Sequence, residues 1–228
     1  MPTSIYKLKS GKRVPSVTTI GKRFQDSEGL KAWNYNTGYA HAEAGLGPDR
    51  FRVQEEAADI GTYVHALFAW HLDGEEGPEP DPAQSIGVKY LTFENIERGR
   101  VGYQKALDWL AQNSLEITSL EIPLVSEQHR FGGTPDGLTF SHEKLGLADW
   151  KTSNKLYSDY LIQLAGYWIL WEENNPDQPI TGGIDIVRFS KDYGDFTHFH
   201  ADDLTLEKEQ FLMYRRAYEN DLKIRKRI

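Results

Sequence analysis

Two short motifs place acidic and basic side chains at a spacing that suits metal chemistry. The stretch Gly132-Gly133-Thr134-Pro135-Asp136-Gly137 is followed, 13 positions after its aspartate, by Asp149-Trp150-Lys151. The glycines let the backbone bend and approach a ligand, so a hairpin would bring Asp136 and Asp149 together. Two carboxylates, with the Trp150 carbonyl as a third oxygen ligand, suit Mg²⁺ or Mn²⁺. The motifs therefore predict a site that holds a hard divalent cation against a phosphate.

Lys151 adds a positive charge to this predicted site. It lies two positions after Asp149, and on a strand residues i and i+2 point to the same face. A lysine there would position an attacking water or neutralise charge that develops on the phosphate. Taken alone, the Asp-x-Lys pattern is common and also fits an exposed, salt-bridged strand. Asp136 favours the catalytic interpretation.

Two helical patterns supply further candidates. His65 follows Gly61 by about one turn, and its imidazole would favour Mn²⁺ over Mg²⁺; the alternative is a structural or exposed histidine. Gln163 and Tyr167 are four positions apart and would share one helix face. They would bind a phosphate or a base, or orient Lys151. The alternative is that Tyr167 is a core residue and Gln163 its hydrogen-bond partner.

Hydrophobic periodicity and turn residues predict the elements that must position these side chains. Residues 13–20 are expected to be extended, with Pro15 at the edge of the segment. Helices are predicted over 30–44, 54–72, 86–112, 158–174 and 204–222, and strands over 117–125, 131–140, 145–152, 183–189 and 195–200. Gly99 and Gly102 are expected to interrupt the third helix.

This order of elements predicts an α/β (α+β) fold, in which helices flank a central mixed β-sheet. The length of 228 residues suits one domain. Its expected parts are a helical N-terminal part over 1–115, a catalytic core over 116–200 and a C-terminal helix over 201–228.

Composition narrows the classes of function. The chain has no cysteine, which excludes disulfides, thiolate metal sites and cysteine nucleophiles. Its net charge is −8, yet residues 1–31 carry seven Lys/Arg against two Asp/Glu, and residues 215–228 carry six against two. These basic ends suit contacts with phosphates, or are solvated termini. Without an apolar run of about 18 residues or a signal-peptide core, we expect a cytoplasmic protein with no membrane partner.

Together the motifs resemble a known nuclease family. Gly61-Thr62-x-x-His65, the Gly133–Gly137 motif, Asp149-Trp150-Lys151-Thr152 and Gln163-x-x-x-Tyr167 resemble the RecB-type branch of the PD-(D/E)XK superfamily. Pro15-Ser16-Val17-Thr18 with the later Trp33 is similar to phage and mitochondrial genome maintenance exonucleases of that branch. The resemblance spans roughly residues 14–170. It implies a restriction-endonuclease-like core.

The resemblance also implies roles for individual residues. The metal ligands that it implies are His65, Asp136 and Asp149. Lys151 would be the catalytic lysine, and Gln163 and Tyr167 would complete the site. Weaker acidic candidates are Glu121 and Glu56. Some relatives carry a cysteine-ligated iron–sulfur cluster, which this chain cannot form.

These observations predict a stand-alone, Mg²⁺- or Mn²⁺-dependent DNA exonuclease. It would hydrolyse phosphodiester bonds from free single-stranded or duplex DNA ends, in phage or bacterial recombination, repair or genome processing. The alternatives are an endonuclease of the same fold and a non-catalytic DNA-binding module. Aromatic rings would stack on unpaired bases, and the candidates are Tyr63, Trp70 and Tyr90; the alternative is that each is a core residue.

Overall fold

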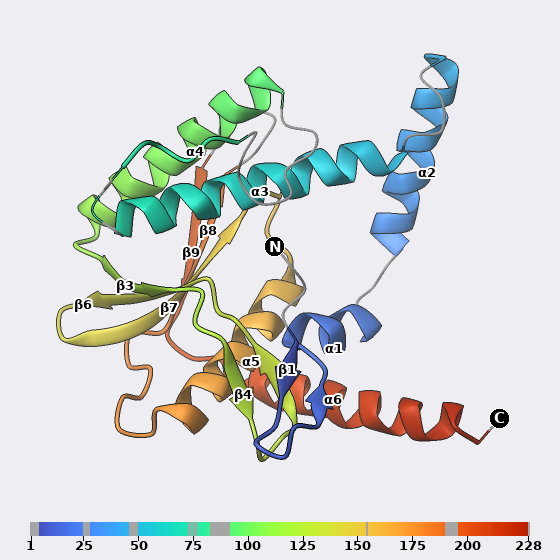
Figure 1. The fold of residues 1–228 in the computed structure, drawn as a ribbon, viewed down its shortest axis with the longest axis vertical. Coiled ribbons are helices and arrows are strands. Elements are labelled where there is room, and N and C mark those ends of the chain that lie inside the picture. Colours follow the sequence, from blue (N-terminus) through green and yellow to red (C-terminus); the bar gives the residue numbers. More distant parts are fainter. Residues whose placement is uncertain are drawn as a thin grey trace.

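A five-stranded mixed sheet forms the centre of the molecule (Figure 1). The computed structural model describes residues 5–24, 28–45, 50–72, 74, 77–82, 92–153, 155–189 and 196–227. The strand order is β3 (Glu116–Leu120), β6 (Gly137–Ser141), β7 (Lys144–Lys151), β8 (Ile184–Phe189) and β9 (Phe196–Ala201). β7 and β8 are parallel, and the other neighbours are antiparallel. The predicted fold, a mixed sheet flanked by helices, is confirmed.

Helices cover both faces of this sheet. The parallel pairing of β7 with β8 needs a crossover, which α5 (Ser158–Asn174) supplies over the predicted range. On the same side lie α1 (Val17–Phe24) and α6 (Thr205–Arg225), whereas α3 (Arg50–Leu72) and α4 (Phe93–Gln112) cover the other side (Figure 1). The remaining helix is α2 (Glu28–Glu43), close to its predicted range.

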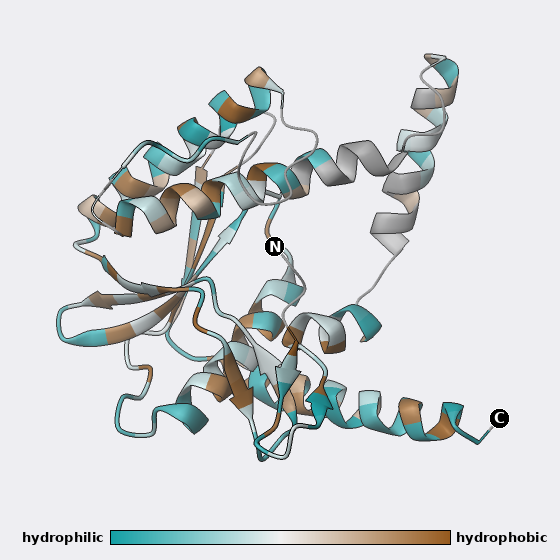
Figure 2. Ribbon diagram, viewed as in Figure 1, coloured by the Kyte–Doolittle hydropathy of each residue, from teal (hydrophilic) through white to brown (hydrophobic). Residues whose placement is uncertain are grey.

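Successive side chains of the strands point to opposite faces of the sheet, and this alternation divides the hydrophobic core into two clusters. Leu147 and Ile186 face the α5 side, and Ala148 and Val187 face the α3–α4 side. Figure 2 shows hydrophobic residues concentrated on the central strands and on the helices that cover them. Leu72, at the C-terminal end of α3, is 39% exposed. No helix within the described ranges is long and apolar enough to cross a membrane.

Two of the predicted strands are each broken into two. The range 117–125 contains β3 and β4 (Leu124–Ser126), and 131–140 contains β5 (Phe131–Gly133) and β6. Glu121 adopts a positive φ of 49° and Pro123 cannot donate to a ladder, so the first strand stops there. β4 and β5 then form a small sheet of their own. The second break leaves Asp136 in the link just before β6.

The segment 13–20 is only partly extended, so that prediction is wrong for its second half. β1 (Tyr6–Lys7) pairs with β2 (Arg13–Val14), but α1 begins at Val17. The hydroxyl oxygen of Ser16 accepts a hydrogen bond of 3.0 Å from the backbone N–H of Thr19 and caps the helix. Burial of Val17 and Ile20 on one helix face outweighs the β-preference of this branched run.

Gly99 and Gly102 do not interrupt α4, contrary to expectation. A Cβ at Gly99 would lie 3.0 Å from the Tyr63 ring, and one at Gly102 would lie 2.5 Å from the Phe189 ring. Glycine therefore allows α4 to pack closely against α3 and β8. Thr92 caps the helix through a bond of 3.2 Å from the Asn95 N–H. Positions 86–91 of the predicted helix lie outside the described residues.

The C-terminal third of the chain follows the predicted order. The strands predicted over 183–189 and 195–200 are β8 and β9, which pair antiparallel. The turn predicted between them, around Tyr193-Gly194, lies outside the described residues. α6 follows as expected and packs against α5.

Candidate active site

Strand pairing brings Asp136 close to the strand that carries Asp149. Asp136 directly precedes β6, and the β6–β7 register sets Gly137 opposite Ala148. The Asp136 carboxylate accepts a hydrogen bond of 3.1 Å from the backbone N–H of Trp150. Asp136 and Asp149 are 13 positions apart in the sequence. The hairpin brings their two motifs together at the C-terminal end of β7, as the sequence analysis expected.

Asp149 is a buried carboxylate whose hydrogen-bonding capacity is not met. Its exposed fraction is 0%, and neither carboxylate oxygen has a hydrogen-bond partner of ordinary geometry among the described residues. It forms an ion pair with Lys151. Burial raises the pKa of Asp149 to about 7; the Asp136 charge adds to this rise, and Lys151 opposes it. Such a group strongly favours a cation that would replace its lost hydration.

Lys151 lies on the same face of β7 as Asp149, as the i, i+2 spacing requires. Its ammonium stands 5.0 Å from the centre of the Tyr160 ring. Burial alone would lower the pKa of Lys151, but the Asp149 and Asp136 carboxylates outweigh burial and raise the pKa. Lys151 is therefore a protonated cation at neutral pH and is suited to neutralising negative charge, not to accepting a proton.

His65 reaches the same place from α3. Its Nε2 lies 3.7 Å from Asp136 Oδ2, and its Nδ1 lies 3.3 Å from Glu121 Oε1. One turn further along α3, Phe68 stacks on the ring of Trp150 at 4.4 Å and fixes the helix against β7. Burial lowers the pKa of His65, but the neighbouring carboxylates raise it by more. Glu121 thus holds the imidazole nitrogen that faces away from Asp136, which is how carboxylates orient metal-binding histidines.

The structure confirms the structural interpretation of Gln163 and Tyr167, and their catalytic role stays a prediction. Gln163 Nε2 donates a hydrogen bond of 3.0 Å to the Tyr167 hydroxyl, and Tyr167 is buried in the α5 core. Burial raises the pKa of Tyr167 well above its usual value, and the charges of Asp136 and Asp149 add to the rise. Tyr167 is therefore a core residue whose hydroxyl lies within the field of both carboxylates.

The glycines before Asp136 serve packing more than bending. Gly132 and Gly133 have no positive φ. A Cβ at Gly133 would lie 2.8 Å from the Tyr167 ring, and one at Gly132 would collide with the ring of Tyr6. The Tyr6 hydroxyl also shares a hydrogen bond of 2.8 Å with the Thr134 hydroxyl. The motif is therefore clamped between two aromatic rings, which hold Asp136 in place.

Other candidates lie away from this centre. Glu56 precedes His65 by nine positions on α3, which is about 13 Å along the axis. Tyr63 is fully buried and donates its hydroxyl to Glu79 at 2.8 Å, so it cannot stack on a base. Trp70 is partly buried against the core. Tyr90 and the side chain of Trp33 lie outside the described residues.

Sequence reasoning missed two residues that the structure brings to the site. Tyr160 lies under Lys151. Arg188 stands opposite Lys151 in the parallel ladder; it donates to the Ser153 carbonyl at 3.2 Å and to the Thr197 hydroxyl at 2.7 Å. Arg188 therefore fixes the segment that follows Lys151. Nothing in the local sequence signals this role, because only strand pairing makes the two residues neighbours.

The donor set fits a hard divalent cation. Asp136, Asp149 and the Trp150 carbonyl offer oxygens, and His65 offers a nitrogen. The unsatisfied oxygens of buried Asp149 support this fit. The ligand atoms are not yet clustered: within the described part of the chain, the one group of three acidic or histidine side chains with ligand atoms all within 4.8 Å lies elsewhere. Binding would require Asp149 to share its carboxylate between Lys151 and the ion.

No family model matches the chain, and no curated protein matches its sequence. Solved structures do match its fold. One is a presumed exonuclease from Eubacterium rectale, with a TM-score of 0.50 and 15% identity over 74% of this chain and 67% of that chain. Two are of LHK-Exo, the alkaline exonuclease of Laribacter hongkongensis. One of these is a complex with dAMP; it has a TM-score of 0.38 and 17% identity, over 76% of this chain and 90% of that chain. The other has a TM-score of 0.33 and 17% identity, over 75% of this chain and 90% of that chain. At these identities the likeness concerns the fold alone and rests on the first structure.

Proposed function

We propose that this chain is a divalent-metal-dependent DNA nuclease of the PD-(D/E)XK type that acts on free DNA ends. The observation that carries the proposal is the buried Asp149 carboxylate. It pairs with Lys151 and lies beside Asp136 at the end of β7, and its oxygens have no hydrogen-bond partner of ordinary geometry among the described residues. Residues 1–228 would form one nuclease domain, with the parts 1–115, 116–200 and 201–228 as expected from the sequence.

Four groups would hold Mg²⁺ or Mn²⁺ in this proposal: His65, Asp136, Asp149 and the Trp150 carbonyl. When bound, the ion would polarise the scissile phosphate and lower the pKa of a water molecule. The Trp150 N–H fixes the orientation of Asp136, and Glu121 fixes that of His65. These contacts limit the rearrangement that binding requires.

The remaining groups would act on the phosphate. Lys151, kept protonated by its carboxylate neighbours, would neutralise the charge that develops during hydrolysis. Gln163 would contact the phosphate or a base, because it reaches the site from α5 and is oriented by Tyr167. Gln163 and Tyr160 also line a cavity of about 240 Å³ between α1, α5 and α6. No covalent intermediate on the chain is needed.

A basic surface supports DNA as the substrate. The two basic ends of the sequence meet in a second cavity of about 240 Å³. Its cationic lining residues are Lys12, Arg13, Arg130, Arg215, Lys223 and Lys226, against one acidic residue, Glu219. The β1–β2 hairpin of this surface is joined to the Asp136 motif by the Pro15 carbonyl, which accepts a bond of 3.0 Å from the Gly132 N–H. Cations so placed would bind the phosphate backbone irrespective of its sequence.

Exonuclease action is favoured over the alternatives by the motif resemblance and by the name of the Eubacterium rectale neighbour. An endonuclease of the same fold would use the same site. A non-catalytic DNA-binding module would not need the contact of Asp149 with Lys151. The proposed role is recombination, repair or genome processing in a phage or bacterium.

The test compares linear and circular DNA, with Mg²⁺, Mn²⁺ or excess EDTA. We expect metal-dependent loss of a linear single strand and of duplex ends, with a single-stranded circle intact. Labels at either end then give the polarity of digestion. Equal rates on circle and linear strand would support the endonuclease instead. DNA binding without any cleavage in either metal would support the non-catalytic module.

A further inference from the structure

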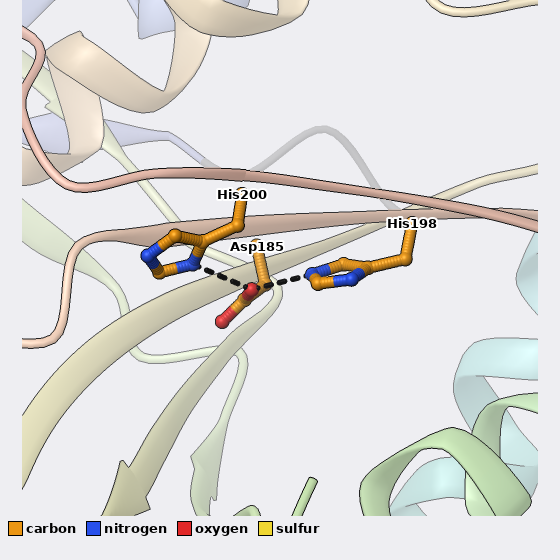
Figure 3. A group of neighbouring side chains, drawn as sticks. All are labelled: Asp185, His198 and His200. Atoms are coloured by element: carbon orange, nitrogen blue, oxygen red, sulfur yellow. Dashed lines mark hydrogen bonds and ion pairs between the residues drawn. The ribbon is translucent and has the colours of Figure 1, made fainter.

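Three side chains converge on the other face of the sheet, away from the proposed nuclease site. Asp185 lies on β8, and His198 and His200 lie two positions apart on β9 (Figure 3). The antiparallel register sets His200 opposite Asp185 and His198 opposite Val187. Because Val187 belongs to the α3–α4 core, all three side chains point to that side. The ring of Trp109 from α4 lies 4.7 Å from His198 and supports it.

The nitrogens of both histidines are directed at one carboxylate oxygen. Asp185 Oδ1 lies 2.7 Å from His198 Nε2 and 2.9 Å from His200 Nδ1 (Figure 3). Within the described residues, this is the one group of three such side chains whose ligand atoms all lie within 4.8 Å of one another. Neighbouring ligands around Zn²⁺ are about 3.3 Å apart. Small side-chain rotations would therefore open the space for an ion.

Hydrogen bonds alone satisfy both ring nitrogens of His200 only when the ring is positively charged. His200 Nε2 also faces a carboxylate, Asp202 Oδ1, at 3.2 Å. A neutral imidazole carries one N–H, so it can donate to Asp185 or to Asp202 but not to both. A metal ion on Nδ1 would let Nε2–H donate to Asp202 and would satisfy every atom of a neutral ring. A carboxylate behind a ligating histidine is the usual arrangement in metal sites.

The surroundings provide both burial and access. Asp185 is 4% exposed, whereas the His198 and His200 side chains are 29% and 40% exposed. All three line a cavity of about 390 Å³. Polar residues of β6, β7 and their turn form much of the remaining wall, and they are Thr139, Ser141, His142 and Lys144. An ion held by the three side chains would keep open positions toward this cavity for water or a small anion.

We propose that Asp185, His198 and His200 form a second metal site, specific for a transition ion such as Zn²⁺. Two imidazoles and one carboxylate suit Zn²⁺ and related ions, whereas Mg²⁺ prefers oxygen ligands. The site is separate from the nuclease centre, because Asp185 pairs with Ala148 and the next residue, Asp149, faces the opposite side of the sheet. An ion there links β9, the edge strand of the sheet, to β8.

The test uses the untagged full chain, stripped with a chelator, and Zn²⁺ alone as the probe. Asp136→Asn and Asp149→Asn together first silence the proposed nuclease centre. In this background we expect one Zn²⁺ per chain by calorimetry and a rise in melting temperature. Adding His198→Gln weakens Zn²⁺ binding at least about tenfold. The matched control, His142→Gln, lies on the same cavity wall outside the three ligands and leaves binding unchanged.

A second measurement avoids any dependence on the variants. In the unmutated chain, Zn²⁺ should shift the ¹⁵N signals of the His198 and His200 rings, and Mg²⁺ should not. The His129 ring, in the turn between β4 and β5, serves as the internal reference. Absence of saturable Zn²⁺ binding in the silenced background overturns the proposal, as does equal binding with and without His198→Gln. Unshifted His198 and His200 signals at saturating Zn²⁺ lead to the same conclusion.

Discussion

Asp149 and Lys151 form an ion pair on one strand, although Asp149 is fully buried and its oxygens lack hydrogen-bond partners of ordinary geometry. An isolated pair of this kind is a poor source of stability, because removing the charges from water costs more than their attraction returns. The Asp136 carboxylate nearby makes the cost larger, and it raises the pKa of Asp149 further. The arrangement is therefore understandable as a site prepared for a cation.

Substitutions of Asp149 and of Lys151 should affect metal binding differently. Asp149→Asn should lose both Mn²⁺ binding at the site and cleavage. Lys151→Met should still bind Mn²⁺ but lower the rate of cleavage by about 10²–10³-fold, because it removes charge stabilisation and no ligand. Calorimetry with Mn²⁺ and single-turnover cleavage measure the two effects. A folded Lys151→Met protein that binds no Mn²⁺ would contradict the roles assigned here.

Divalent metal should be required for activity and should stabilise the fold. Cleavage should stop in excess EDTA, return with Mg²⁺ or Mn²⁺, and be stronger with Mn²⁺ than with Ca²⁺, because His65 is a nitrogen donor. At 100 times its dissociation constant, Mn²⁺ should add about 2.7 kcal/mol to the free energy of unfolding. Thermal melts of the unmutated chain and of Asp149→Asn check this. If Mn²⁺ raised the melting temperature of the unmutated chain and of Asp149→Asn equally, the ion would bind elsewhere.

Glu121 should tune the metal site without being a ligand. Glu121→Gln removes the charge that faces His65 Nδ1 at 3.3 Å. We expect Mn²⁺ affinity to fall by about 10–100-fold, with activity restored at high Mn²⁺ concentration. Glu56→Gln, about 13 Å along α3 from His65, is the matched control and should change little. Loss of activity that Mn²⁺ cannot restore would make Glu121 a direct participant.

Two helix glycines should respond in opposite ways to alanine. A Cβ at Gly102 meets the Phe189 ring at 2.5 Å, so Gly102→Ala should lower the free energy of unfolding by about 1–3 kcal/mol. A Cβ at Gly61 meets only the Thr152 hydroxyl, at an ordinary 3.5 Å. Gly61→Ala should therefore be neutral or gain up to about 1 kcal/mol from helix propensity. Urea unfolding of both variants tests the packing of α4 on β8.

The basic cavity at the two ends of the chain should govern DNA affinity. Lys223→Glu with Lys226→Glu should weaken binding of any DNA sequence and reduce its dependence on salt, because two phosphate contacts are lost. Arg98→Glu with Lys105→Glu, both on α4 in the other helical layer, is the matched control, because it changes the net charge by the same amount. Fluorescence anisotropy with labelled DNA at several salt concentrations measures the effect. Identical salt slopes for all three proteins would argue against this surface.

The sequence by itself determined the chemistry of the proposed nuclease site and the order of the elements. Spacing of two along β7 put Asp149 and Lys151 on one face, and spacing of four on α5 joined Gln163 to Tyr167. Such relations are set by strand and helix period, which the local sequence carries. The sequence also predicted the hairpin that brings the two aspartates together, although Gly132 and Gly133, on which that prediction partly rested, serve packing instead.

Only the tertiary structure decided which residues of distant elements become neighbours. Gly99 and Gly102 are predicted to break a helix, but the rings that they meet come from α3 and β8. The spacing of His198 and His200 is visible in the sequence, yet their carboxylate partner Asp185 is fixed by the β8–β9 register. Arg188 joins the site only because a parallel ladder sets it beside Lys151. Pairing between distant strands depends on the packing of the whole sheet, and that information is absent from any local pattern.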